Sequence, residues 1–208
     1  MSEHESTKNH DLQSVFIKTE KARTGRENQV YSPEGARIVA GCIALSEDKH
    51  KVIMITSSKH TNRWILPKGG VEKDEITDYS KAAERETWEE AGVLGVVTRE
   101  LMVVHDFRFK GKKKGLNVDT IIDGESIPKS EFHFYEMTVE ELATSWPEGN
   151  NRSRRWCTYS EAKHELIKAR RLELLDALND SNIIKDVPVI EAGIEGHQID
   201  AHEAADEY

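Results

Sequence analysis

The chain has 208 residues, of which 37% are hydrophobic and 32% are charged, and its formal net charge is −9. This composition suits one globular domain with an extensive polar surface. The longest apolar run, from Ile38 to Leu45, is interrupted by Gly41 and is too short to cross a bilayer. The polar N-terminus does not resemble a signal peptide. We therefore expect a protein without a membrane partner, located in the cytoplasm or also in the nucleus.

The negative charge is concentrated near the C-terminus. Residues 186–208 contain seven acidic residues and no Lys or Arg, so residues 1–185 are close to neutral. Such a segment, with little aromatic content and no amphipathic period, is typical of disorder. Residues 1–28 are similarly polar. We expect a single domain at 29–185 between disordered tails at 1–28 and 186–208; an acidic tail that competes for a basic site is the alternative.

The two cysteines lie in apolar, strand-like contexts. Cys42 and Cys157 are predicted to be small core residues in a reducing compartment, not a disulfide or a metal pair.

The first predicted elements are strands. Two β-branched apolar runs, Arg37–Leu45 and Val52–Thr56, are separated by the turn Ser46–Lys49 and predict a hairpin. A short strand at Trp64–Leu66 follows, and it ends in a turn rich in Pro and Gly.

A helix is predicted next, over Asp78–Ala91. Thr77 or Asp78 can cap its start, and Gly92 supplies a residue that tolerates positive φ just past its end.

Three glutamates cluster on this helix. Glu86, Glu89 and Glu90 are spaced i, i+3 and i+4, which makes their side chains neighbours on one face. Carboxylates at this spacing repel one another, and a hard divalent cation such as Mg²⁺ relieves the repulsion because it prefers oxygen ligands. The alternative for this turn alone is a solvated acidic face.

The rest of the chain predicts more strands and then two helices. Strands followed by helices that can cover both faces favour an α/β/α sandwich with a mixed central sheet. The predicted strands are Val96–His105, Glu131–Thr138 and Arg154–Tyr159, and the helices are a segment capped by Ser160 that runs to Lys168 and a segment at Leu172–Leu178.

A long insert separates two of these strands, at about residues 106–130. It lacks a clear period, and connections this long are usually functional or disordered. Its basic cluster would attract a polyanion if the insert overhangs the metal, although a solvated lysine loop explains the composition equally well. We expect the insert to shape substrate access; the cluster consists of Lys110, Lys112, Lys113 and Lys114.

Together, the run Trp64–Gly70 and the segment RETWEEAGV, which begins at Arg85, resemble the Nudix box. Two features depart from that pattern: nine residues instead of seven separate Glu75 from Arg85, and Thr87 occupies an apolar slot. The role of Glu75 is therefore open.

The Nudix resemblance implies an α/β/α sandwich that hydrolyses a nucleoside diphosphate linked to another group. It implies Glu86 and Glu90 as metal ligands and Glu89 as general base, although the base varies within the family. Arg85 would hold a glutamate by bidentate pairing. The implied cofactor is Mg²⁺, with Mn²⁺ as an alternative.

Roughly residues 25–185 resemble one Nudix branch, the diphosphoinositol polyphosphate phosphohydrolases of the fungal type. The resemblance runs through Glu27–Cys42, Ser57–Glu72, Glu131–Glu136 and Arg152–Leu178. It implies removal of the β-phosphate of inositol pyrophosphates, cleavage of diadenosine penta- and hexaphosphate, and internal cleavage of polyphosphate.

A highly phosphorylated substrate needs many cations, hydroxyls and close backbone approaches around one metal site. For each basic residue, an ordinary surface charge is the alternative. The residues that match or neighbour phosphate-binding positions of the branch are Arg37, Ser57, Ser58, Lys59, Lys129, Arg152 and Arg171. Further candidates for substrate binding are Lys68, Gly69 and Gly70.

Other functions remain as alternatives. A pyrophosphatase for nucleotide sugars, ADP-ribose or the mRNA cap would use the same metal helix, and a catalytically silent module could bind a phosphorylated ligand. The slightly acidic core does not favour nucleic acid as a partner. We expect small polyanionic partners and a monomer.

Overall fold

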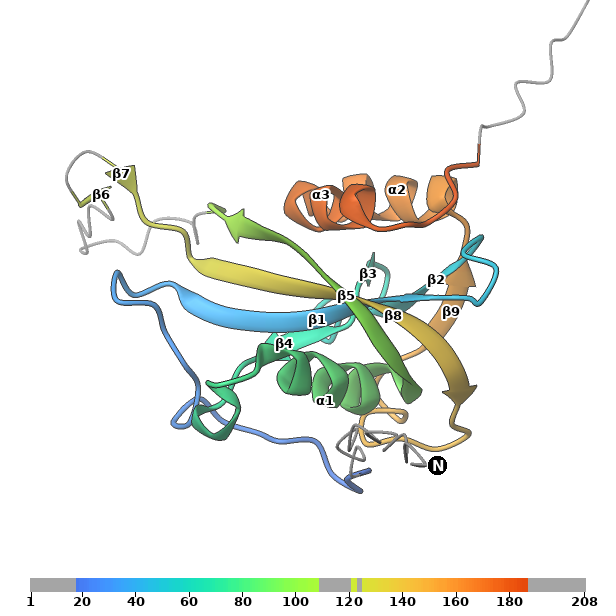
Figure 1. Ribbon diagram of the computed structural model, residues 1–208, viewed down its shortest axis with the longest axis horizontal. Helices are drawn as coiled ribbons and strands as arrows, with labels where there is room; N and C mark the ends of the chain where they lie inside the picture. Colours follow the sequence, from blue (N-terminus) through green and yellow to red (C-terminus); the bar gives the residue numbers. More distant parts are fainter. Residues whose placement is uncertain (1–17, 109–120, 123–124, 187–208) are drawn as a thin grey trace, which may run out of the picture.

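The computed structural model describes residues 18–108, 121–122 and 125–186. These residues form a seven-stranded mixed sheet with helices on both faces (Figure 1), which confirms the predicted α/β/α architecture. The lysines at positions 110 and 112–114 and the tails at 1–17 and 187–208 lie outside the described residues. The elements are β1 (Arg37–Leu45), β2 (Val52–Thr56), β3 (Trp64–Ile65), β4 (Lys68–Gly70), η1 (Lys73–Glu75), α1 (Tyr79–Ala91), β5 (Val93–Asp106), β6 (Ile121–Ile122), β7 (Glu125–Ser126), β8 (Ser130–Leu142), β9 (Arg154–Cys157), α2 (Tyr159–Lys168) and α3 (Leu172–Asp180).

The centre of the sheet is a parallel pair. The strand order is β3-β2-β1-β8-β5, with β4 pairing to β1 and β9 to β2. Strands β1 and β8 pair in parallel from Arg37 opposite Ser130 to Leu45 opposite Thr138, whereas the other pairings of this sheet are antiparallel. Strand β1 is buried along nearly its whole length, because helices cover both of its faces.

Helix α1 covers one face of the sheet, and α2 and α3 cover the other (Figure 1). The Asp78 carboxylate accepts a hydrogen bond from the Ser80 backbone N–H at 3.1 Å, so Asp78 is the N-cap of α1. Gly92 ends the helix with φ of 60° and donates its N–H to the Trp88 carbonyl. The expected start and stop of this helix are confirmed.

Several local predictions need correction. Thr158, not Ser160, caps α2, and its hydroxyl accepts from the Glu161 N–H. Ser160 instead donates its N–H and hydroxyl to Asp186. Strand β5 starts at Val93 and β8 continues to Leu142, beyond the predicted bounds, because the two pair with each other through several irregularities in register. The Pro/Gly turn after β3 contains strand β4, which pairs with β1.

The ends of the described region contact the folded domain. The indole N–H of Trp88 donates to the Thr19 carbonyl at 2.9 Å, so residues assigned to the N-terminal tail lie against α1.

Both Cys42 and Cys157 are free and buried, as predicted, and burial raises the pKa of Cys42 to about 12. No helix in the described ranges is long and apolar enough to cross a membrane.

Candidate active site

The site is organised around one turn of α1, where the three predicted glutamates are largely buried. Glu89 is 2% exposed and Glu90 is 7% exposed. Burial raises the pKa of all three carboxyls, to about 8 for Glu86, whose two glutamate neighbours add repulsion. Burial and the mutual repulsion of the glutamates therefore disfavour the ionised carboxylates, and repulsion is the condition that the spacing predicted.

Arg85 ties this turn to the loop before the helix. It makes a bidentate pair with Glu75, from Nε to Oε1 at 2.6 Å and from Nη2 to Oε2 at 3.0 Å. Nη1 donates to Glu86 at 2.8 Å and lies 3.5 Å from Glu89 Oε2, and Nη2 also donates to the Gly70 carbonyl. Because Arg85 is buried, these contacts fix the position of its guanidinium between the loop and the glutamates of the helix. Glu75, whose role was open, orients the Arg85 side chain.

Strand β4 brings backbone against the acidic turn. A Cβ at Gly69 would lie 1.9 Å from Glu86 Oε2, and a Cβ at Gly70 would lie 2.6 Å from Arg37 Nη2. Glycine at both positions therefore lets these side chains approach the backbone, and a larger residue would displace them. The backbone N–H of Lys68 donates to Glu90 Oε2 at 2.8 Å, so β4 also holds the last carboxylate of the cluster.

Arg152 was predicted to bind phosphate, and in the structure it contacts Glu90. Its Nη2 lies 2.6 Å from Glu90 Oε1, and its Nη1 donates to the Thr56 carbonyl at 2.9 Å. Its Nε donates to Glu148. The side chain is only 7% exposed. In this arrangement Arg152 orients a carboxylate of the acidic turn.

Three of the predicted cationic side chains are held in partly desolvated positions. Burial lowers the pKa of Lys68 to about 7, with the nearby positive charge of Arg171 adding to the effect, and it also lowers the pKa of Arg37 and Arg171. Cations held in this way favour an anionic ligand, which would offset their desolvation. Arg171 also pairs with Glu173, and Arg37 Nε donates to Gln29 at 2.6 Å.

The remaining predicted binding residues lie in two places. Ser57, Ser58 and Lys59 occupy the turn after β2, where the Ser57 N–H donates to the Arg63 carbonyl at 2.8 Å. Lys59 is exposed. Lys129 precedes β8 and is exposed, with its carbonyl accepting from the Arg37 N–H.

A cavity of about 710 Å³ opens beside this turn and next to the acidic cluster. Ser58 and Arg152 connect it to the predicted site, and the N-terminal segment forms another part of its wall. Lining residues include Lys21, Thr24, Ser58, Glu148, Asn151 and Arg152.

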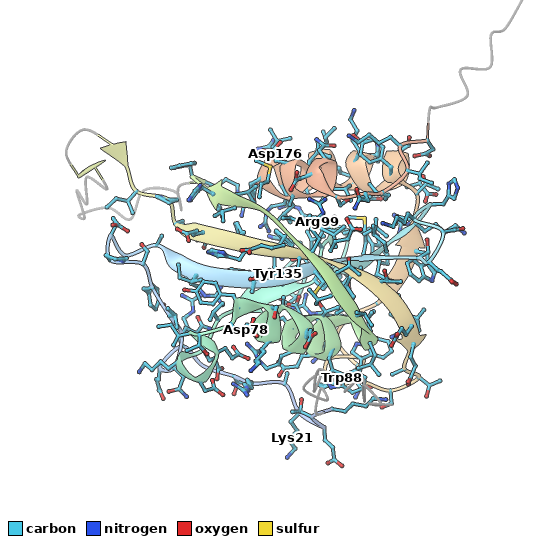
Figure 2. The ribbon with its side chains drawn as sticks, in the orientation of Figure 1. Lys21, Asp78, Trp88, Arg99, Tyr135 and Asp176 are labelled. Atoms are coloured by element: carbon cyan, nitrogen blue, oxygen red, sulfur yellow. The ribbon has the colours of Figure 1, made fainter. Side chains whose placement is uncertain are left out.

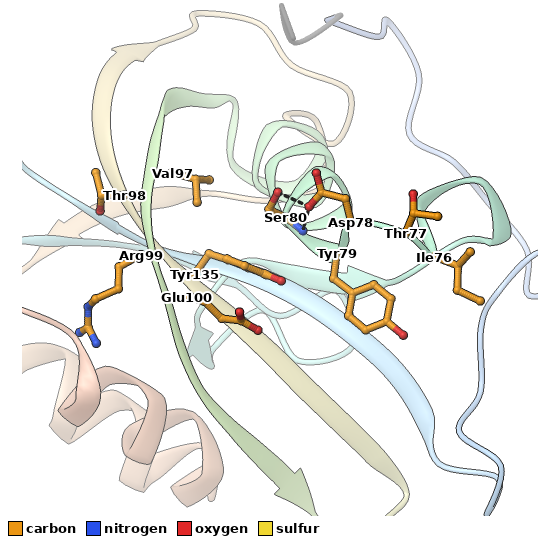
Figure 3. Close-up of a pocket in the computed structure, with 10 residues that line it drawn as sticks. All are labelled: Ile76, Thr77, Asp78, Tyr79, Ser80, Val97, Thr98, Arg99, Glu100 and Tyr135. Atoms are coloured by element: carbon orange, nitrogen blue, oxygen red, sulfur yellow. Dashed lines mark hydrogen bonds between the residues drawn. The ribbon is translucent and has the colours of Figure 1, made fainter. Parts of the chain in front are cut away.

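A second hollow of about 560 Å³ lies at the start of α1, between that helix and strands β5 and β8 (Figure 3). Tyr79, Arg99 and Tyr135 are among its lining residues. Burial raises the pKa of Tyr135 to about 12. None of the predicted site residues lines this hollow, so the acidic turn and its cavity are the better candidate for chemistry.

The donor set suits a hard divalent cation. Glu89 Oε1 is buried and has no hydrogen-bond partner within the described ranges. Within those ranges, no three acidic, His or Cys side chains converge on one point, because Glu86 turns to Arg85 and Glu90 turns to Lys68 and Arg152. Carboxylate oxygens are nevertheless the ligands that Mg²⁺ or Mn²⁺ prefers, and a bound cation would favour their ionised form.

Several contact residues were not identified from the sequence. Glu148 pairs with Arg152, and Arg108 makes a bidentate pair with Asp106 and lies 3.6 Å from Glu173, which links it to the Arg171 side chain. Arg23 contacts Glu89 through its backbone N–H at 3.0 Å. The positive charge of Arg108, next to the insert, could have identified it from the sequence. The contact of Arg23 could not be predicted in this way, because it is made by a backbone N–H.

Comparison with known proteins identifies the family of the chain. Residues 35–178 match the NUDIX domain. The chain is 36% identical over 146 residues to "Nudix hydrolase 21, chloroplastic" of Arabidopsis thaliana, covering 68% of this chain and 65% of that relative. It is 32% identical over 157 residues to "Diphosphoinositol polyphosphate phosphohydrolase 3-alpha" of Homo sapiens, covering 72% of this chain and 84% of that relative. The chain therefore belongs to the Nudix family.

A solved structure supports the fold. A "NUDIX hydrolase from Nitrosomonas europaea" superposes with a TM-score of 0.53 at 12% identity, over 70% of this chain and 87% of that chain. The family, the fold and the acidic turn together define a hydrolase that acts on phosphoanhydride bonds.

Proposed function

We propose that the chain is a divalent-metal-dependent hydrolase of highly phosphorylated small molecules. It removes the β-phosphate of diphosphoinositol polyphosphates and cleaves diadenosine penta- and hexaphosphate, with internal cleavage of polyphosphate as a further activity. The observation that carries this proposal is the set of partly desolvated cations, Arg37, Lys68 and Arg171, around the acidic turn of α1. A substrate with many phosphates would supply further anions, which would offset the desolvation of these side chains.

Glu86 and Glu90 are the proposed ligands of Mg²⁺, or of Mn²⁺ as the alternative. The bound cation would neutralise the diphosphate and polarise water for in-line attack. Glu89 takes the proton of the attacking water as general base. Its buried Oε1, which has no hydrogen-bond partner in the described part of the chain, is the oxygen available for this task.

Arg85 and Arg152 have a positioning role in this scheme. Each orients a proposed metal ligand, Arg85 through Glu86 and Arg152 through Glu90. The absence of a side chain at Gly69 lets Glu86 lie close to strand β4, and Gly70 does the same for Arg37. We propose that Ser57, Ser58, Lys59 and Lys129 contact the outer phosphates, because they occupy polar segments at the ends of strands.

The relatives support the choice of substrate without restricting it. The human and mouse relatives named as diphosphoinositol polyphosphate phosphohydrolases are each 32% identical to the chain. The Arabidopsis relatives carry only general Nudix names, so a pyrophosphatase for nucleotide sugars, ADP-ribose or the mRNA cap is the second candidate. A catalytically silent binding module is the third. We propose a monomer in the cytoplasm and nucleus, although several relatives are named chloroplastic or mitochondrial.

The decisive experiment measures phosphate release from a diphosphoinositol pentakisphosphate in the presence of Mg²⁺. Diadenosine hexaphosphate, ADP-ribose and a capped RNA serve as parallel substrates. We expect hydrolysis of the first two only. Preference for ADP-ribose or for the cap would contradict the substrate assignment, and binding without turnover of any substrate would favour the silent module.

A further inference from the structure

The chain before the family domain lies against the acidic turn of α1. Two contacts anchor this N-terminal segment, defined here as residues 18–25. Thr19 accepts a hydrogen bond from the Trp88 indole at 2.9 Å, and Lys18 Nζ lies 5.7 Å from the centroid of the Trp88 ring. Figure 2 shows Lys21 and Trp88 on the same side of the helix. The matched Nudix domain begins at residue 35, so the segment lies outside the matched residues.

Arg23 is the residue of this segment that reaches the proposed base. Its backbone N–H donates to Glu89 Oε2 at 3.0 Å. Its guanidinium holds the loop before the helix, with Nη1 at 2.9 Å from Glu72 Oε2 and 3.1 Å from Asp74. The same nitrogen lies 3.8 Å from Glu75 Oε1, the partner of Arg85. The side chain therefore fixes the position from which the backbone donates.

The two oxygens of Glu89 have different surroundings as a result. Oε2 accepts from the Arg23 N–H and lies 3.5 Å from Arg85 Nη1, whereas Oε1 is buried and has no hydrogen-bond partner in the ranges described. A carboxylate fixed through one oxygen presents the other in a defined direction. Such geometric precision is what proton transfer requires of a base.

We propose that Arg23 is a positioning residue, whose backbone N–H orients Glu89 for its role as base while its guanidinium anchors the segment to the loop before α1. This inference rests on the proposed function, because Glu89 acts as the base only there. It adds an N-terminal element outside the Nudix domain to the active site.

The test uses variants of the full chain that separate the backbone donor from the side chain. Arg23→Pro removes both the N–H and the guanidinium, Arg23→Ala removes the guanidinium alone, and Arg23→Lys keeps the N–H and a positive charge. Steady-state hydrolysis of a diphosphoinositol pentakisphosphate is measured with Mg²⁺ for each. We expect kcat of Arg23→Pro to lie about tenfold to a hundredfold below that of Arg23→Ala, as loss of a charge-assisted hydrogen bond predicts, with unchanged KM. Arg23→Lys should restore most of the kcat.

The matched control is Ala22→Pro, which places the same rigid ring one residue earlier and leaves the Arg23 N–H in place. We expect it to keep most of the kcat. An equal loss in Ala22→Pro and Arg23→Pro would overturn the proposal, because stiffness of the segment would then explain both. A rise in kcat for Arg23→Pro would also overturn it, since the segment would then shield Glu89.

A double variant tests whether the two residues act together. Adding Arg23→Pro to Glu89→Gln should lower kcat no further than Glu89→Gln alone, because the donor acts through that carboxylate. Additive losses would place the effect of Arg23 elsewhere and contradict the inference. If the wild-type chain hydrolyses none of the substrates, the proposed function fails. If it hydrolyses them and Arg23→Pro retains full kcat, only the positioning role fails.

Discussion

Two buried glutamates of this protein have opposite surroundings. Glu136 on β8 is 1% exposed and accepts hydrogen bonds from the Asn182 N–H at 2.8 Å, from the Asn182 side chain at 3.1 Å and from Lys49 at 3.2 Å. Its pKa is lowered because these bonds outweigh burial. Glu89 on α1 is equally buried, yet its pKa is raised and one oxygen lacks a partner in the described structure.

This difference in hydrogen bonding distinguishes Glu136, which stabilises the fold, from Glu89, which we propose as the general base. Glu136 ties β8 to the turn after β1 and to the end of α3, and its charge is matched within the fold. On α1, Glu86 and Glu90 accept hydrogen bonds from Arg85, Arg152 and the Lys68 N–H, whereas Glu89 Oε1 is buried with no partner among the described residues. Such burial is unfavourable unless a ligand supplies positive charge. Burial alone therefore does not distinguish the two kinds of site, whereas the hydrogen-bond partners do.

The largest expected effect is the loss of catalytic activity when Glu89 is substituted. Glu89→Gln should lower kcat about a hundredfold to ten-thousandfold, because the neutral amide cannot accept the proton of water. Substrate affinity, measured by isothermal calorimetry, and Tm should be retained. The matched control is Glu84→Gln on the same helix, which should keep wild-type kcat. Retained turnover in Glu89→Gln would assign the base to another carboxylate.

The next effect concerns Glu136, where stability should change instead. Glu136→Ala leaves the buried donors of Asn182 without an acceptor and should lower the free energy of unfolding by about 2 to 3 kcal/mol. Chemical denaturation measures this loss. The kcat should stay at the wild-type value under stabilising conditions. A fall in kcat with unchanged stability would mean that Glu136 belongs to the active site.

A smaller effect is expected at the two glycines of β4. The methyl group of Gly69→Ala would displace Glu86, so the Mg²⁺ concentration for half-maximal activity should rise about tenfold. Gly70→Ala would displace the Arg37 guanidinium instead and should raise KM for the substrate at saturating Mg²⁺. Titrations of metal and of substrate distinguish the two outcomes. Identical effects of both variants would indicate a general distortion of β4.

The smallest effect is a dependence of stability on pH that arises from Glu136. Because its pKa is lower in the folded protein than its ordinary value of 4.5, its stabilising contribution is complete above that value and is lost as the pH falls through the folded pKa. The difference in Tm between wild type and Glu136→Gln should therefore shrink below about pH 4.5. A difference that stays constant on acidification would contradict a matched, ionised Glu136.

Local patterns predicted the elements better than their partners. The cap at Asp78, the stop at Gly92 and the strand pair β1 and β2 follow from residue types at fixed spacing. The parallel pairing of β1 with β8 joins distant segments, and no local pattern encodes that register. Thr158 and Ser160 are both good caps, so only the path of the chain into α2 could decide between them.

In the candidate site, too, local spacing was predicted correctly and the partners of individual side chains were not. The spacing of the glutamates placed them together on one helix face, as predicted. The partners of Arg152 could not be predicted, because a basic residue pairs equally well with phosphate or with a carboxylate such as Glu90. Arg23 was missed for a different reason: every non-proline residue has a backbone N–H, so the contact leaves no mark in the residue type.

The parallel pairing at the centre of the sheet also has a consequence for folding during synthesis. Strand β1 lies between β2 and β8, and β8 is synthesised only after α1 and β5. Until then one edge of β1 exposes apolar side chains and unpaired backbone groups, which can template aggregation. Chains truncated before residue 130 should therefore precipitate even though they contain the whole acidic turn.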